Sequence, residues 1–136
     1  MVNRAIEDVE GIGKVTGAKL RAAKVKDTDR LLAAAATPKK RKALAEKCGL
    51  TEKRILKFAN MADLYRVNGV GSEYAELLEK AGVDTVPELA QRNAAQLTKM
   101  LAEANKTAKL TRRLPSEADV KKWVAEAKKL PRALEY

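Results

Sequence analysis

Apolar residues recur along this chain at intervals of three and four positions, the spacing of one face of an α-helix. The stretch Thr51–Val67 carries one such stripe, formed by Ile55, Phe58, Ala59, Ala62 and Tyr65. The stretch after Ser116 carries another, formed by Val120, Trp123, Val124 and Ala127. Ala, Leu, Lys and Glu are abundant and aromatic residues make up only 4% of the chain, which also favours helix over sheet. We therefore predict an all-α fold.

The pattern of apolar and glycine positions occurs twice, with an offset of 58 residues. The first copy holds Ile6, Val9, Gly11, Ile12, Gly13, Gly17 and Leu20, and the second holds Leu64, Val67, Gly69, Val70, Gly71, Ala75 and Leu78. A later match, between "TEKRILKF" at Thr51 and "SEADVKKW" at Ser116, has an offset of 65. The seven extra residues of the second copy therefore fall in the polar stretch Asn105–Pro115. Such internal repetition predicts two pseudo-symmetric repeats, at about residues 4–63 and 64–131.

Capping signals divide each repeat into short helices. A short helix is expected to end at Val9 or Val67, and a second to run from the Gly-apolar-Gly turn to about Ala23 or Ala81. A third begins near Thr28 in one copy and near Val86–Pro87 in the other. The expected N-caps of the later helices are Thr37 before Pro38, Asn93, Thr51 and Ser116, the last with Asp119 in capping-box position. Gly49 is expected to end the helix that follows Thr37.

The two repeats are predicted to be joined by helix. Between Thr51 and Val67 there is neither a glycine nor a proline, so no stop signal separates the helical stripe from the second turn. We therefore expect residues 1–136 to form a single all-α unit.

The apolar-x-Gly-apolar-Gly-x-x-x-small-x-x-Leu pattern resembles the helix-hairpin-helix motif, once in "IEDVEGIGKVTGAKL" and once in "LYRVNGVGSEYAELL". Nearly the whole chain also resembles a bacterial family known only as a domain of unknown function, whose members contain segments like "RRLPSEADVKKWVAEAKKLP". The first resemblance implies a tandem helix-hairpin-helix bundle of the SAM-like type. It also implies that the turn amides hold a phosphate of a nucleic-acid backbone.

The first turn has the chemistry that such a contact needs. The first N–H groups of the helix after Gly13 have no partner within the helix, and the helix N-terminus is partially positive. Glycine at positions 11 and 13 lets a phosphate oxygen approach the backbone closely. The candidate nucleic-acid contacts of this turn are Gly11, Ile12, Gly13, Lys14, Thr16 and Lys19.

The second turn is expected to act mainly in packing. Glu73 lies in the first turn of its helix and is attracted to the same helix end that a phosphate would occupy. The positions that would contact nucleic acid if this turn also binds are Gly69, Val70, Gly71 and Ser72.

The charge distribution supports this difference. Lys and Arg number 28 against 18 Asp and Glu, a net charge of +10 that suits a polyanion or an acidic surface. Residues 1–64 hold fifteen of the basic and eight of the acidic side chains. The densest basic run adds the candidate contacts Lys39, Lys40, Arg41 and Lys42, and a second run contains Lys106, Lys109, Arg112 and Arg113.

Several classes of function are excluded by the composition. The chain has no histidine and one cysteine, Cys48, so histidine-based acid–base chemistry and zinc sites built from histidine or several thiolates are not available. We expect no enzyme activity, no cofactor and no metal. The charged N-terminus and the short longest apolar run, "LLAAAA", predict a soluble, cytoplasmic protein without membrane contact, in a monomeric state.

Three hypotheses remain. The first is a module that binds nucleic acid independently of sequence, with double-stranded DNA favoured over RNA. The second is a scaffold whose basic face binds an acidic protein. The third, a glycosylase- or nuclease-like enzyme, is disfavoured because Asp84 follows the second turn too closely to match the catalytic aspartate of glycosylases that share the motif.

Overall fold

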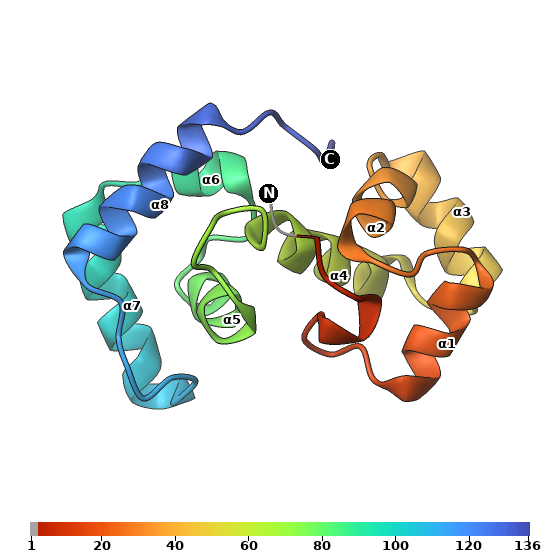
Figure 1. Cartoon of the computed structure of the whole chain (residues 1–136), viewed down its shortest axis with the longest axis horizontal. Helices are drawn as coiled ribbons and strands as arrows, with labels where there is room; N and C mark the ends of the chain where they lie inside the picture. The colour runs from red at the N-terminus through yellow and green to blue at the C-terminus, as the bar shows by residue number, and fades with distance from the viewer. Residues whose placement is uncertain (1–2) are drawn as a thin grey trace. The chain divides into compact units, whose positions relative to one another are not determined.

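The computed structural model describes residues 3–136 and confirms the all-α prediction (Figure 1). It contains eight α-helices and one short 3-10 helix, and none of the described residues belongs to a β-strand. Contacts divide the chain into two compact units. The N-terminal unit comprises residues 3–63 together with Arg132–Tyr136, and the C-terminal unit comprises Leu64–Pro131.

The N-terminal unit is built from four α-helices around an apolar core. Its elements are η1 (Ile6–Asp8), α1 (Lys14–Ala22), α2 (Thr28–Ala34), α3 (Pro38–Cys48) and α4 (Glu52–Leu64). Helix α1 packs against η1 and α3, and α2 packs against α3. The side chains that fill the core include Ile6, Leu20, Leu31, Ile55 and Phe58. Gly17 allows the approach of η1, since a Cβ there would lie 2.6 Å from Oε2 of Glu7.

The last five residues pack onto the N-terminal unit. Leu134 is buried, and the backbone N–H of Glu135 donates to the carbonyl of Ala36 at 2.8 Å. The hydroxyl of Tyr136 donates to Oδ1 of Asn60 at 2.8 Å. The N-terminal unit is therefore completed by residues from the far end of the sequence.

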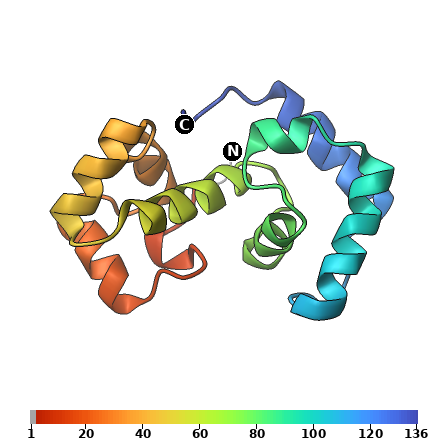
Figure 2. The ribbon, with the colours of Figure 1, turned by 180° about the vertical axis from the view of Figure 1, so that it is seen from behind.

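The C-terminal unit contains the other four helices. They are α5 (Ser72–Lys80), α6 (Val86–Ala90), α7 (Ala94–Ala108) and α8 (Glu117–Lys129). Helix α8 lies alongside α6 and α7, while α7 also packs against α5 (Figures 1 and 2). The indole of Trp123 on α8 is buried in this core, as the apolar stripe predicts.

The predicted caps are confirmed. Side-chain oxygens of Thr37 and Asn93 accept from the amides three residues later, and Ser116 forms the capping box with Asp119. Oγ1 of Thr51 accepts from the amide of Arg54 at 3.1 Å. Gly49 ends α3 in the left-handed conformation.

Helix α4 ends earlier than the sequence indicates. It stops at Leu64, and the amide of Val67 donates to the carbonyl of Leu64 in a turn. Tyr65, Arg66 and Val67 are all buried, and the Tyr65 hydroxyl lies 3.1 Å from Oγ of Ser72. Burial of these side chains in the C-terminal unit ends the helix without a glycine or proline, because tertiary packing overrides local propensity.

No helix in the described residues is both long and apolar enough to cross a membrane.

Candidate functional site

The first turn exposes backbone at the start of α1. Gly11 has a φ of +89°, a conformation that side chains other than glycine adopt with strain. Gly13 is the N-cap of α1, with φ −89° and ψ −170°, and no side chain caps the helix there. A Cβ at Gly13 would meet nothing within 4 Å, so this face of the turn is open.

Ile12 serves the turn differently from its glycine neighbours. Its side chain is buried, and its amide donates to the carbonyl of Val9 at 3.0 Å. Its N–H is therefore already used within the turn, and Ile12 anchors the loop rather than offering a contact. Val70 is buried in the same way, with its amide 3.2 Å from the carbonyl of Val67.

Side chains of α1 and α4 surround the open helix end. Lys14 and Lys19 are exposed, and Thr16 is half-buried. The guanidinium of Arg54 donates to Oγ1 of Thr16 at 3.3 Å and lies 5.4 Å from the ring centre of Phe58. Phe58 in turn supports the turn, since its Cε1 would be 3.4 Å from a Cβ at Gly11. The structure thus brings a fixed cation to the first turn of α1.

Arg54 was not among the residues singled out from the sequence, although a signal for it was present. The offset of 65 residues that relates Thr51 to Ser116 and Phe58 to Trp123 also relates Arg54 to Asp119. Asp119 is engaged in the capping box, where its Oδ2 accepts from the amide of Ser116 at 3.2 Å. The two equivalent positions therefore carry opposite charges, and only the N-terminal unit has a cation there.

The basic run at the start of α3 is split by the helix period. Lys39, Lys40 and Lys42 are exposed, as a surface for anions requires. Arg41 is not available for such a contact, because it lies on the buried face of α3 with Leu44, Ala45 and Cys48. Its guanidinium donates to the carbonyls of Ala35 at 2.9 Å and Glu135 at 2.7 Å and lies 5.6 Å from the ring centre of Tyr136. This corrects the expectation for Arg41, whose role is to hold the C-terminal segment.

The second turn has the same backbone geometry as the first. Gly69 has a φ of +88°, and Gly71 caps α5 with φ −96° and ψ −168° and without a side-chain cap. A Cβ at Gly69 would lie 3.3 Å from Nε1 of Trp123. One side of this turn therefore packs on the core, as the Gly11 side of the first turn packs on Phe58.

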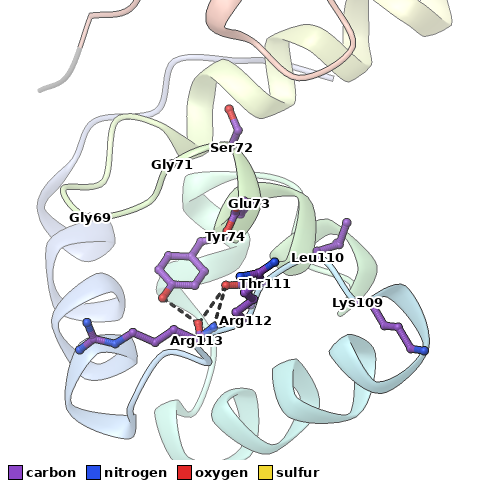
Figure 3. A pocket seen from close by; sticks show the side chains of 10 residues that line it. All are labelled: Gly69, Gly71, Ser72, Glu73, Tyr74, Lys109, Leu110, Thr111, Arg112 and Arg113. Atoms are coloured by element: carbon purple, nitrogen blue, oxygen red, sulfur yellow. Dashed lines mark hydrogen bonds between the residues drawn. The ribbon is translucent and has the colours of Figure 1, made fainter.

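The other side of the second turn lines a cleft of about 810 Å³ (Figure 3). The residues that line it are Gly69, Gly71, Ser72, Glu73, Tyr74, Lys109, Leu110, Thr111, Arg112 and Arg113. The cleft brings the second turn together with much of the second basic run. These two segments are separated in sequence by α5, α6 and α7. We call it the loop cleft.

The two glycine turns differ from the other helix starts. Side-chain oxygens of Asp27, Thr37, Thr51, Thr85, Asn93 and Ser116 cap the remaining six helices. Among the α-helices of residues 3–136, only α1 and α5 begin without such a cap. Their first amides are therefore left to water or to a ligand.

Burial and hydrogen bonds shift the pKa values of several titratable groups. The hydrogen bond from Arg21 lowers the pKa of Glu7 to about 2, and the two side chains are 2.6 Å apart. Burial raises the pKa of the Cys48 thiol, which lies 3.7 Å from the carbonyl of Lys19. Burial also raises the pKa of Asp84, with smaller contributions from Glu88 and Glu79. In the described part of the chain, no three His, Cys, Asp or Glu side chains gather in a group that could hold a metal ion.

Comparison with known proteins places the chain in a family without assigning it an activity. No solved structure matches it. The model of one family, described as a domain of unknown function (DUF4332), matches residues 10–130. Because that match covers most of the 136 residues, the chain belongs to the DUF4332 family.

Proposed function

We propose that the N-terminal unit binds nucleic acid independently of sequence, with double-stranded DNA as the preferred form, and has no catalytic activity. The observation that carries this proposal is the uncapped start of α1 at Gly13, with the guanidinium of Arg54 held 3.3 Å from Thr16 in the first helical turn. Backbone amides, helix dipole and cation all favour an anion at one place.

A phosphate group fits this arrangement. The open face of Gly13 lets an oxygen approach the first amides of α1, and the exposed ammonium of Lys14 adds charge at the same helix end. The same unit provides further contacts to the nucleic-acid backbone through the exposed side chains of Lys39, Lys40 and Lys42. Contacts of this kind position a protein on the duplex without reading bases.

We also propose that the two turns form tandem helix-hairpin-helix motifs. The agreement between the turns supports this arrangement: φ is +89° at Gly11 and +88° at Gly69, and both following helices start at a glycine N-cap. An aromatic side chain lies beside the first glycine of each turn, Phe58 in one unit and Trp123 in the other. The charge difference between Arg54 and Asp119 makes the first turn the stronger phosphate site.

Salt-dependent binding of duplex DNA tests the proposal. A site with about four to six phosphate contacts gives a log–log slope of affinity against salt of roughly −4 to −5. Lys14→Glu and Arg54→Gln should each weaken binding at least tenfold at low salt, the loss expected for a charge-assisted contact worth about 1.5–3 kcal/mol. Gly13→Val should weaken binding without unfolding the protein, because its side chain would enter open space.

Lys47→Glu is the matched control, since Lys47 is exposed and lies in the last turn of α3. It changes the net charge as Lys14→Glu does, but in the last turn of α3 and not at the start of α1. Scrambling the DNA sequence should leave the affinity unchanged. A folded protein that does not bind duplex DNA at low salt contradicts the proposal, and so does an unchanged affinity in folded Lys14→Glu.

A second candidate function is the binding of an acidic protein segment. A groove of about 460 Å³ beside α8 is lined by Arg92, Ala94, Lys121, Val124, Ala125, Lys128 and Lys129, all of them described residues and none of them acidic. Its four cations and apolar floor suit an acidic amphipathic segment. Lys128→Glu would then abolish capture of an acidic peptide while leaving duplex binding unchanged.

A further inference from the structure

The loop cleft exists because the second repeat has a longer connection before its last helix. Its outer wall is the segment 109–113, which lies within the extra polar stretch between α7 and α8. Its inner wall is the second glycine turn and the first turn of α5 (Figure 3). A volume of about 810 Å³ is within the usual range for ligand sites.

The outer wall is held in place by side-chain hydrogen bonds. Oδ1 of Asn105 accepts from the amides of Leu110 at 2.9 Å and Thr111 at 3.1 Å, and its Nδ2 donates to the carbonyl of Thr111 at 2.9 Å. The Tyr74 hydroxyl donates to the carbonyl of Arg113 at 2.9 Å and ties the loop to α5. The cleft is therefore preformed, so a ligand does not have to order the loop.

Its side chains combine positive charge with an aromatic ring. Lys109, Arg112 and Arg113 contribute three cations, against one carboxylate from Glu73. The ring of Tyr74 is half-buried. Its centroid lies 5.3 Å from that of the Trp123 ring, and the two ring planes make an angle of 51°. In Figure 3, Lys109 and Arg113 extend toward opposite sides of the loop, with Arg112 between them.

This spread of charges distinguishes between ligands. A single small anion can meet one of the cations, whereas a chain with several phosphates can follow all three. Tyr74 and Leu110 offer an apolar surface on which an unpaired base can pack. The bases of a duplex are stacked on one another and cannot present their faces to such a ring.

We propose that the loop cleft binds a short single-stranded segment of nucleic acid. Lys109, Arg112 and Arg113 bind its phosphates, and Tyr74 packs against a base. This site lies in the C-terminal unit and does not depend on the duplex contact proposed for the first turn. Glu73 opposes the binding, because its carboxylate lies in the same cleft as the phosphates.

The sign of the Glu73 effect gives the sharpest test. The affinity for a fluorescein-labelled thymidine tetranucleotide is measured by anisotropy at low salt. Glu73→Gln should raise the affinity several-fold, because it removes a like charge from the cleft. Arg112→Gln with Arg113→Gln should lower it at least tenfold, as expected when two phosphate contacts are lost.

The contribution of the ring is measured separately. Tyr74→Leu should lower the affinity at least fivefold, the lower end of the range for one stacked base. Tyr74→Phe should keep most of the affinity, because it retains the ring and loses only the bond to the Arg113 carbonyl. Lys80→Gln is the control, since Lys80 is an exposed cation in the last turn of α5 and does not line the cleft.

Other oligonucleotides and variants separate this proposal from its alternatives. A uridine tetranucleotide that binds as tightly supports a site that accepts either sugar. Thymidine monophosphate binding as tightly as the tetranucleotide overturns the proposal, as does weaker binding in Glu73→Gln or no binding by the wild type. Lys14→Glu should leave tetranucleotide binding unchanged, so failure of the duplex contact and failure of the cleft are observed independently.

Discussion

The two glycines of the first turn differ in backbone conformation and in surroundings, although they form one Gly-apolar-Gly motif in the sequence. Gly11 has a positive φ and lies against Phe58, so Gly11→Ala should lower the free energy of unfolding by about 1–2 kcal/mol. Gly13 has an ordinary φ and open space beside it, so Gly13→Ala should change stability by less than about 1 kcal/mol. Urea unfolding of the two variants measures both values, and equal destabilisation would contradict this division of roles.

Among the helices, α4 supports the first turn through two of its side chains. It carries both Arg54 and Phe58, and Ala59 beside them is fully buried. Ala59→Pro should destabilise the protein by about 3 kcal/mol or more. The proline ring clashes with the preceding helical turn, and proline lacks the N–H that donates the backbone hydrogen bond. The measurement is thermal or urea unfolding, with Lys57→Ala as the control at an exposed position of the same helix. The prediction is wrong if the two variants are equally stable.

At the scale of the whole molecule, the chain enters the C-terminal unit at Leu64 and returns to the N-terminal unit at Arg132. Deleting Arg132–Tyr136 removes the burial of Leu134 and one of the two carbonyl partners of Arg41. The N-terminal unit should lose about 2 kcal/mol or more of stability, as for other deletions of a buried leucine. Hydrogen exchange should become faster in α3 and stay unchanged in α7.

Glu135→Ala is the control for that deletion, since both hydrogen bonds of Glu135 to the unit come from its backbone. Its exchange should match that of the wild type. Unchanged exchange in α3 after the deletion would show that the segment contributes no stability.

The sequence predicted those features that depend on neighbours along the chain. The caps at Thr37 and Ser116 follow from local chemistry, and the burial of Phe58 and Trp123 follows from the helical period. The same period applied to α3 would also have placed Arg41 with Leu44 on the buried face.

Other features depend on contacts distant in sequence. The end of α4 is set by the burial of Tyr65, and Arg54 is placed at the first turn by its bond to Thr16. The loop cleft depends on the hydrogen bonds of Asn105 and Tyr74, which no local pattern reveals. That residues 1–136 form one rigid body stays a prediction, which NMR relaxation of the two units would check.

The return of the chain at Arg132 has a consequence for the order of events on the ribosome. The C-terminal unit is one continuous stretch, Leu64–Pro131, and has all of its residues once that stretch has emerged. The N-terminal unit is synthesised first, yet the carbonyl of Glu135 reaches the guanidinium of Arg41 across 94 positions of sequence. A contact of that separation closes late, because the ends of a long segment must first be brought together. Of these two units, the one that is synthesised first is therefore the one whose contacts are completed last.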